Sequence, residues 1–316
     1  MSEKKVIAVL GATGAQGGGL ARAILADSDG GFAVRAVTRD PSSEAAQALA
    51  ALGAEVVAGD IDDEASLERA FAGAHGAYCV TFFWAHFNPD LEMAQAANMA
   101  RAAKSAGVHH VIWSTLEDTR DFIPLEDDRM PTLGGRFKVP HYDAKGEAND
   151  SFTDAGVPVT FLQTSFYWEN FIYFGMGPQR GEDGALSLTF PIGDGRIAGI
   201  AAADIGAAAY GIFKAGDTLI GATVSIAGEH LTGEQMAAAF SDQIGEKVTF
   251  NAVTPEAYRG FGFPGAEDLG NMFQFTTEFE DQYTGVRDID ATRRLHPGLQ
   301  SFREWLAANG SAVPVP

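Results

Sequence analysis

The chain has 316 residues, of which 22 are Lys or Arg and 42 are Asp or Glu, so its formal charge is −20. Its length suits about two domains of roughly 150 residues each, and a hydrophobic content of 46% excludes a disordered acidic tail. The excess negative charge excludes a protein that binds nucleic acid or an anionic membrane through a broad basic face. The single cysteine, Cys79, excludes an intrachain disulfide. No secretion signal or membrane span is recognised, so we expect a cytoplasmic protein.

Short apolar segments and alanine-rich segments alternate along the first half of the chain. The apolar, partly β-branched segments predict strands at residues 6–10, 32–38, 55–58, 76–81, 108–114 and 159–163. The alanine-rich segments have helical periodicity and predict helices at residues 16–25, 43–52, 65–71 and 91–106. Strands separated by such helices indicate βαβ units. The predicted fold class is therefore α/β, with a doubly wound parallel sheet covered on both faces.

A glycine-rich loop follows the first predicted strand. The motif Gly11-x-x-Gly14-x-x-Gly17 lies between a buried strand and a helix, which is the context that a dinucleotide-binding fingerprint requires. Gly11 permits a tight turn, Gly14 lets the backbone approach a pyrophosphate, and Gly17 lets the helix pack close to the strand. The helix N-terminus adds unpaired N–H groups, so an acidic protein can still bind phosphate locally. A glycine-rich turn without a ligand is the alternative.

The end of the second strand indicates which dinucleotide binds. The strand is followed by Arg39, whose guanidinium suits the 2′-phosphate of NADP. An NAD site usually carries Asp or Glu here, which accepts a hydrogen bond from the ribose 2′-OH. Asp40 follows directly and leaves NAD as an alternative, although Pro41 indicates that Asp40 begins the next turn. We therefore predict NADP(H), and a solvated arginine without a ligand is the other interpretation of Arg39.

Two further strand ends are expected to border the cofactor. Asp60 and Ile61 follow the third strand, at the position where such folds contact the adenine. Asp60 is equally well placed to cap the helix that follows. Thr81 and Phe82 end the fourth strand and are expected to line the cofactor trench, although the aromatic side chain of Phe82 also suits a core.

Catalytic residues are expected after the fifth strand, because the pattern resembles short-chain dehydrogenases/reductases. That superfamily has a Ser or Thr there, matched by Ser114 and Thr115, and then Tyr-x-x-x-Lys on the next helix. Lys145 fits the lysine and is expected to bind the nicotinamide ribose, but His141 occupies the tyrosine position. Tyr142 is one position out of phase, which rotates it by about 100° around the helix. His141 is either a replacement proton donor, although the nearby ammonium disfavours its charged form, or a positioning residue.

The alternation ends after residue 163. Aromatic residues cluster at 166–168 and 171–174, and shorter elements are expected at 223–226, 232–244, 247–253 and 301–308. This pattern predicts a Rossmann-type NADP(H)-binding domain at residues 1–163. A smaller mixed α/β domain for substrate or partner is expected at residues 164–316, and some of its segments are expected to return to the first sheet.

Sequence blocks along essentially the whole chain resemble the NmrA-like family, and within it the HSCARG-like branch. The blocks are Gly11-Ala-Thr-Gly-Ala-Gln-Gly17, Val37-Thr-Arg-Asp-Pro41, Gly53-Ala-Glu-Val-Val-x-Gly-Asp60, His141-x-Asp-x-Lys-Gly-Glu147 and Phe263-Pro-Gly-Ala-x-Asp-Leu-x-Asn-Met-Phe273. The resemblance implies a Rossmann domain with a small α/β domain and a preference for NADP. It implies that the cofactor contacts Thr13, Gln16, Arg39, Lys145, Thr164 and Ser165. The acidic loop at 117–138 would lie over the cleft. Relatives often carry additional basic residues at the positions of Asp40, Ser42 and Ser43, and this chain does not.

Two functions follow from these observations. The first is an NADPH-dependent reductase of a small aromatic carbonyl, enone or quinone, with Lys145, His141 and Thr115 as catalytic residues. The alternative is a non-catalytic sensor of the NADPH/NADP ratio that regulates a protein partner, as the resemblance also allows. Sugar-nucleotide epimerisation is disfavoured because the superfamily tyrosine is absent. No metal is expected, since His109 and His110 lack ligand spacing. We expect a monomer or homodimer that binds neither nucleic acid nor membrane.

Overall fold

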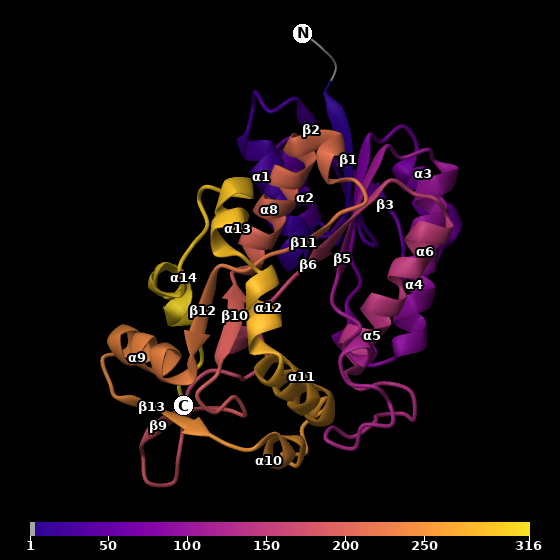
Figure 1. Cartoon of the computed structure of the whole chain (residues 1–316). Coiled ribbons are helices and arrows are strands. Elements are labelled where there is room, and N and C mark those ends of the chain that lie inside the picture. The colour runs from indigo at the N-terminus through magenta and orange to yellow at the C-terminus, as the bar shows by residue number, and fades with distance from the viewer. Residues whose placement is uncertain (1–3) are drawn as a thin grey trace.

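A seven-stranded parallel sheet forms the larger part of the molecule in the computed structural model, which describes residues 4–316 (Figure 1). Its strands are β1 (Lys5–Leu10), β2 (Phe32–Thr38), β3 (Glu55–Ala58), β4 (Gly76–Cys79), β5 (His110–Thr115), β6 (Val159–Gln163) and β11 (Thr223–Ser225). They lie in the order β11-β6-β5-β4-β1-β2-β3, and every neighbouring pair is parallel. The order reverses between β1 and β4. In open parallel sheets, ligands bind at such a point, beyond the carboxyl ends of the strands.

Helices cover both faces of this sheet. Ile7 and Val9 of β1 belong to one buried cluster and Ala8 and Leu10 to another, because successive side chains of a strand point to opposite faces. The first face carries α1 (Ala15–Ala26), α2 (Glu44–Ala51), α8 (Ala202–Ala215) and α13 (Ile289–Leu295). The second face carries α3 (Glu64–Phe71), α4 (Pro89–Ser105), α5 (Pro140–Glu147) and α6 (Asn149–Asp154).

Glycines bring α1 and α8 into backbone contact. A Cβ added at Gly206 would lie 2.1 Å from the backbone nitrogen of Leu20, and one added at Gly19 would lie 2.5 Å from the carbonyl oxygen of Ala203. No side chain fits at either position, so these two helices pack more closely than side chains would permit. Gly19 in the N-terminal glycine cluster therefore serves helix packing.

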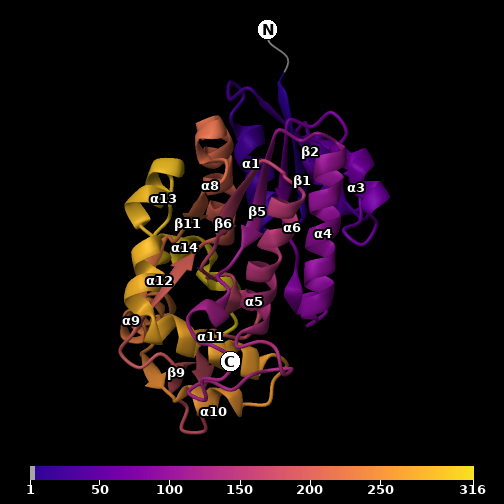
Figure 2. The same cartoon turned by 45° about the vertical axis from the view of Figure 1, so that its right-hand side comes forward.

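The smaller part of the molecule lies beyond the carboxyl ends of the parallel strands (Figures 1 and 2). It has two three-stranded sheets, ordered β12-β10-β7 and β13-β9-β8. The strands are β7 (Phe166–Tyr167), β8 (Gln179–Arg180), β9 (Leu186–Phe190), β10 (Arg196–Ile200), β12 (Glu229–Thr232) and β13 (Val248–Ala252). The helices are α7 (Asn170–Tyr173), α9 (Gly233–Ile244), α10 (Pro255–Arg259), α11 (Ala266–Glu278), α12 (Glu280–Val286) and α14 (Phe302–Asn309). An aromatic-rich core joins them.

The predicted α/β class with a doubly wound parallel sheet is confirmed. The predicted fourth strand is shorter than expected, since β4 ends at Cys79 and leaves Thr81 and Phe82 in the loop that follows. The chain leaves the sheet after Gln163, but α8 and β11 return to it from the second half. Between residues 4 and 316, no helix combines the length and the apolar character needed to cross a membrane.

Candidate functional site

The loop between β1 and α1 forms a cradle of backbone. Gly11 has a φ of +62°, which favours glycine. A Cβ added at Gly17 would lie 2.4 Å from the carbonyl oxygen of Gly11, so the helix can start this close to the loop only with glycine there. Gly14 is the N-cap of α1 and no side chain caps this end of the helix. Its first N–H groups are therefore free for an anion, and Thr13 lies exposed beside them.

Gln16 lies on the first turn of α1 and joins the carboxyl ends of three strands. Its side-chain oxygen accepts hydrogen bonds from Ser114, at 2.8 Å, and from Tyr78. Its side-chain nitrogen donates to the hydroxyl of Tyr167, which also lies 3.2 Å from the hydroxyl of Thr164. Burial raises the pKa of Tyr167 to about 12. Tyr167 belongs to the aromatic cluster at residues 166–168, and the sequence did not indicate the contact of its hydroxyl with Gln16.

Arg39 and Asp40 differ in what they bind. Arg39 is exposed, and its side chain makes no hydrogen bond or ion pair to any residue from 4 to 316. The Asp40 carboxylate accepts hydrogen bonds from the hydroxyl and the backbone N–H of Ser42, at 2.5 and 2.9 Å, which hold its pKa below the usual value. Asp40 thus begins a turn, as its neighbour Pro41 indicated, while the guanidinium of Arg39 stays free.

Asp60 and Ile61 lie in the turn between β3 and α3. The Asp60 carboxylate accepts from the backbone N–H of Asp62 at 3.0 Å, whereas the N-cap of α3 is Asp63. The carbonyl oxygen of Ile61 accepts from the side chain of Asn98 at 2.9 Å. The two residues form an ordered turn at the carboxyl edge of β3, next in the sheet to the strand that ends before Arg39.

Lys145 and Thr81, predicted from distant segments, lie together. The ammonium of Lys145 donates to the hydroxyl of Thr81 at 2.6 Å and lies 2.9 Å from a carboxylate oxygen of Glu92. It also lies 5.0 Å from the centre of the Trp113 ring. The Glu92 side chain is fully buried, and its second oxygen lies 3.2 Å from Nε2 of His86 without hydrogen-bond geometry. A buried carboxylate requires a charge partner, and Lys145 supplies it.

Glu92 gave no signal in the sequence, since an acidic residue on an alanine-rich helix is usually exposed. Phe82, next to Thr81, is 56% exposed and reaches the surface beside this charge pair.

His141 lies one helical turn before Lys145 and makes different contacts. Its Nδ1 lies 2.5 Å from a carboxylate oxygen of Asp268, and its backbone N–H donates to the other oxygen at 3.2 Å. The buried ring packs against Trp84 and Phe83, with centroids 4.8 and 5.9 Å away. Asp268 lies in the sequence block at 263–273, but nothing in the sequence paired it with His141. The two form a histidine–aspartate pair between α5 and α11.

Tyr142 points in another direction, as its phase on the helix predicted. Its hydroxyl lies 2.9 Å from the hydroxyl of Tyr283 on α12, and burial raises its pKa well above the usual value. Tyr142 and Tyr283 make no hydrogen bond to Lys145, so the proton-donating tyrosine of the superfamily is not replaced from the next position.

Thr115 and Ser114 both have their hydroxyl groups engaged. The Thr115 hydroxyl is fully buried and lies 3.0 Å from the carbonyl oxygen of Lys145 and 2.8 Å from the side-chain oxygen of Asn149. The Ser114 hydroxyl donates to Gln16 on the opposite face of the sheet. Thr115 therefore positions the backbone of α5, and the structure does not bring its hydroxyl to the ammonium of Lys145.

Thr164 and Ser165 follow β6. The carbonyl oxygen of Thr164 accepts from the guanidinium of Arg287 at 2.8 and 3.1 Å, and Arg287 is also paired with Glu117. The Ser165 hydroxyl is buried and has no hydrogen-bond partner within the described part of the chain. A buried hydroxyl without a partner is costly, so a ligand or water is expected to satisfy it.

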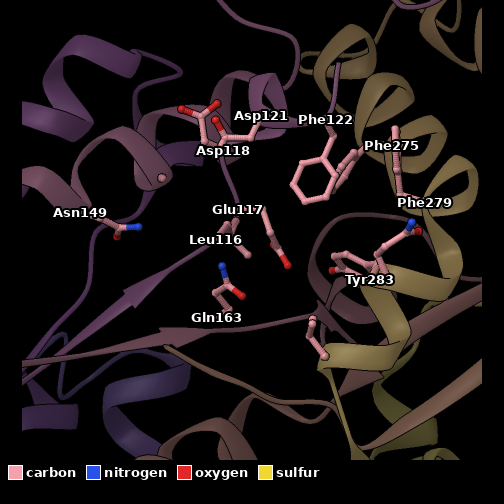
Figure 3. Close-up of a pocket in the computed structure, with 13 residues that line it drawn as sticks. Leu116, Glu117, Asp118, Asp121, Phe122, Asn149, Gln163, Phe275, Phe279 and Tyr283 are labelled. Carbon is pink, nitrogen blue, oxygen red and sulfur yellow. The ribbon is translucent and has the colours of Figure 1, made fainter. Parts of the chain in front are cut away.

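Two cavities flank α5. The acidic cavity, about 360 Å³, is shown in Figure 3 between the segment after β5 and helices α11 and α12; its lining includes Glu117, Asp118, Asp121, Phe122, Phe279 and Tyr283. The aromatic cavity, about 430 Å³, lies on the His141 side, and its lining includes Phe83, Phe87, Pro140, Arg259, Phe263 and Asp268. Residues 116–122 thus border the acidic cavity.

The rest of the loop at 117–138 is fastened to α11. The Asn271 side chain donates to the carbonyl oxygens of Pro131 and Lys138, and Gln274 donates to that of Arg129. These contacts attach the loop to the smaller part of the molecule. Within residues 4–316, no group of His, Cys, Asp and Glu side chains is placed to hold a metal ion.

Comparison with known proteins agrees with this geometry. A model of the NmrA-like family matches residues 3–306. The chain is 29% identical to the NmrA-like oxidoreductase FrzB of Cladobotryum sp., over 90% of this chain and 88% of the relative. It is 28% identical to the NmrA-like oxidoreductase lnaB of Aspergillus flavus, over 97% of this chain and 98% of the relative.

Solved structures share the fold. NmrA, a negative transcriptional regulator solved in complex with NADP, is 26% identical with a TM-score of 0.76, covering 96% of this chain and 94% of that chain. The NADPH-dependent quinone oxidoreductase QOR2 of Escherichia coli, solved with NADPH, is 25% identical with a TM-score of 0.72, covering 96% and 99%. The triphenylmethane reductase of Citrobacter sp., solved with NADP(H), has a TM-score of 0.75 at 22% identity, covering 96% and 99%, which shows the fold alone.

Proposed function

The chain belongs to the NmrA-like family, and from this premise we propose that it is an NADPH-dependent oxidoreductase that reduces a small aromatic carbonyl, enone or quinone. The observation that carries the proposal is the position of Lys145. Its ammonium is fixed at the carboxyl edge of the sheet by Thr81 and a fully buried carboxylate, Glu92. The curated relatives are named oxidoreductases, which supports turnover over a purely regulatory role.

The residues at the carboxyl edge fit NADP(H). Glycine at position 17, where a Cβ would lie 2.4 Å from the carbonyl oxygen of Gly11, lets the uncapped N-terminus of α1 start close to the loop, which fits a pyrophosphate there. Arg39 offers a free guanidinium for a 2′-phosphate, while the Asp40 carboxylate accepts hydrogen bonds from Ser42 in the turn that follows. The buried hydroxyl of Ser165 lacks a partner at the end of β6, which fits a polar group of the ligand. When bound, the cofactor supplies the hydride.

The chain supplies the proton. Lys145 would carry it on Nζ, held toward Thr81, and donate it to the oxygen of the acceptor. Glu92 keeps the ammonium in place and compensates its charge in the buried setting. A lysine can take this part here because Tyr142 is turned toward Tyr283. Thr115 supports this arrangement through the backbone of α5.

The aromatic cavity supports an aromatic acceptor. Phe83, Phe87 and Phe263 line it and offer flat apolar walls. Asp268 lines this cavity and holds His141, which follows Pro140 on α5, and we propose that His141 orients the acceptor. QOR2, which shares the fold at 25% identity, is by name a quinone reductase. We also expect the protein to work in the cytoplasm, since its single thiol, Cys79, is buried and free.

The test is NADPH oxidation by the purified chain with a panel of naphthoquinones, cinnamaldehydes and aromatic aldehydes. We expect acceptor-dependent loss of NADPH absorbance that Lys145→Met abolishes while NADPH still binds, as measured by cofactor fluorescence. NADPH binding without turnover of any acceptor would contradict the reductase. The sensor would then be supported if NADPH and NADP⁺ differed strongly in affinity, because only differential binding can drive a switch.

A further inference from the structure

The aromatic cavity contains one cation, Arg259, among its lining residues. Arg259 ends α10 and is partly buried. Its Nη1 donates to the side-chain oxygens of Asn271, at 3.1 Å, and Gln274, at 2.8 Å, which are neutral amides. Its Nε and Nη2 donate to no atom of residues 4–316. A guanidinium has five N–H donors in a planar fork, so one edge of this fork remains available.

The pairing of Arg259 with neutral amides is unusual in a chain that has 42 acidic residues. Hydrogen bonds that they donate to carboxylates raise the pKa of Arg120, Arg129 and Arg180. Arg259 differs, because burial lowers its pKa and no carboxylate forms an ion pair with it in the described residues. The fold therefore keeps a partly buried guanidinium away from carboxylates and fixes it with amides.

Two carboxylates also line the cavity. Asp268 accepts from the ring and the backbone N–H of His141, so its oxygens are already engaged. Glu267 is exposed and makes no hydrogen bond to Arg259 within the described chain. Glu267 and Glu256 act on Arg259 only through longer-range attraction. No carboxylate of residues 4–316 thus occupies the free edge of the guanidinium.

The walls of the cavity are held rigidly. Gly265 has a φ of +86°, and a Cβ there would lie 2.9 Å from the Trp84 ring. The segment at Gly265 therefore packs directly against the turn that carries Trp84 and Phe87. Phe87 has a φ of +53°, a strained conformation for a bulky residue, and its ring packs against Phe83 and Trp84 at 6.2 and 5.6 Å. A Cβ at Gly270 would lie 2.5 Å from the Arg259 stem. Both the rings and the cation are therefore preorganised.

We propose that the aromatic cavity binds an aromatic acceptor that carries a carboxylate, and that Arg259 anchors this carboxylate through Nε and Nη2. The phenylalanine rings contact the flat part of the ligand, and the planar fork matches a carboxylate in a bidentate pair. Pro140 lines the cavity and begins the helix on which Lys145 lies about 7.5 Å further along the axis. The inference rests on the proposed function for the identity of the ligand as the acceptor.

The experiment compares two redox-inert ligands, 1-naphthoate and its neutral isostere 1-naphthamide, by calorimetric titration of the intact chain. We expect naphthoate to bind about tenfold more tightly than naphthamide. Arg259→Gln is expected to remove this preference by weakening naphthoate about tenfold while leaving naphthamide within about twofold. Arg259→Lys, which keeps the charge but loses the fork, should retain only part of the preference.

Arg69→Gln is the matched control, because Arg69 is exposed on α3 and lies outside both cavities. It makes the same charge change and is expected to leave both affinities unchanged. Equal binding of the two ligands, binding of neither, or the same loss in Arg69→Gln as in Arg259→Gln overturns the anchor. Because neither ligand is reduced, a preference for naphthoate in a chain that oxidises no NADPH supports the anchor and contradicts only the proposed reductase.

Discussion

Both edges of the parallel sheet carry titratable side chains, but the contacts that these side chains make differ between the edges. At the amino edge, His109 pairs with Asp217 at 2.9 Å, His110 lies 2.9 Å from the hydroxyl of Thr160, and His75 stacks on His109. At the carboxyl edge lie the glycine cradle, the Lys145–Glu92 pair and Ser165. The cavities that flank α5 are also on this side.

The two edges differ in their buried polar atoms that lack hydrogen-bond partners. In the part of the chain that the structure describes, the buried polar atoms without hydrogen-bond partners belong to His86, Glu92, Gln95, Trp113 and Ser165. None of them belongs to the histidine cluster at the amino edge. Because an unpartnered buried polar group costs about 1–3 kcal/mol, such atoms mark places where a ligand or water completes the structure. The histidine cluster at the amino edge is thus satisfied from within the chain, and we infer that the carboxyl edge is where a ligand binds.

The largest expected effect comes from removing Lys145, the proposed proton donor at the carboxyl edge. Lys145→Met is expected to lower kcat for acceptor reduction by about 10³-fold, since a positioned proton donor contributes roughly 10²- to 10⁴-fold. Stopped-flow measurement of single-turnover NADPH oxidation gives this rate. The folded structure, measured by circular dichroism, should be retained. A loss of less than about threefold would assign the proton to another group.

Arg39→Ala tests the same edge at the other end of the cofactor. We expect the Kd of NADPH to rise about 30-fold, because a charge-assisted hydrogen bond to a phosphate contributes roughly 2 kcal/mol. The Kd of NADH is expected to stay within about twofold, since NADH has no 2′-phosphate. Fluorescence titration with both cofactors measures this. Equal weakening of NADPH and NADH would remove Arg39 from the 2′-phosphate site.

Glu92→Gln tests whether the negative charge of Glu92 holds the Lys145 ammonium in place. The variant keeps a hydrogen-bond acceptor near the ammonium but loses the negative charge 2.9 Å away. We expect kcat to fall about tenfold, because the ammonium loses the carboxylate that holds it in place. Single-turnover NADPH oxidation is the readout. Asp90→Asn is the control, because it makes the same charge change on α4 at an exposed carboxylate that pairs with Arg136. A kcat that is unchanged in Glu92→Gln, or that falls equally in Asp90→Asn, contradicts the role.

The smallest effect is expected at the amino edge and concerns stability alone. Burial lowers the pKa of His110 to about 4 from a usual 6.5. The unfolded chain therefore takes up a proton first as the pH falls, and stability present above pH 6.5 is lost on the way down to about pH 4. Lowering the pH by about one unit from 6.5 should cost about 1 kcal/mol.

His110→Gln should reduce this pH dependence. Denaturant unfolding of both proteins across this pH range measures the difference, and kcat should not change. Activity that falls together with stability would contradict the separation of the two edges.

Local patterns predicted the first half of the fold well. β1 to β6 and the helices α1 to α4 follow from apolar segments and alanine-rich periodicity, because each forms from neighbouring residues. β11 has three residues, and its place beside β6 depends on a pairing across some 60 positions, which no local pattern encodes. We expected some segments of residues 164–316 to return to the first sheet, but the sequence did not indicate which segments these are.

The candidate site divides in the same way. The glycine loop, Arg39 and Lys145 could be predicted as candidates because each belongs to a short motif with a known spacing. Glu92 and Asp268 were missed, since each becomes a site residue only through its partner on a distant helix. Gln16 was found, but its engagement with Ser114, Tyr78 and Tyr167 depends on three strand ends that meet only in the folded chain.

The close approach of α1 and α8 at Gly19 and Gly206 has a consequence for dissecting the molecule. The helix that presents the phosphate cradle is supported from behind by a segment that is synthesised some 180 residues later. A fragment ending at residue 163 would leave Leu20 and Ile24 of α1 uncovered and β6 without its outer neighbour. The nucleotide half is therefore not a module that can be cut out or exchanged alone. Any chimera must carry α8 and β11 from the same parent.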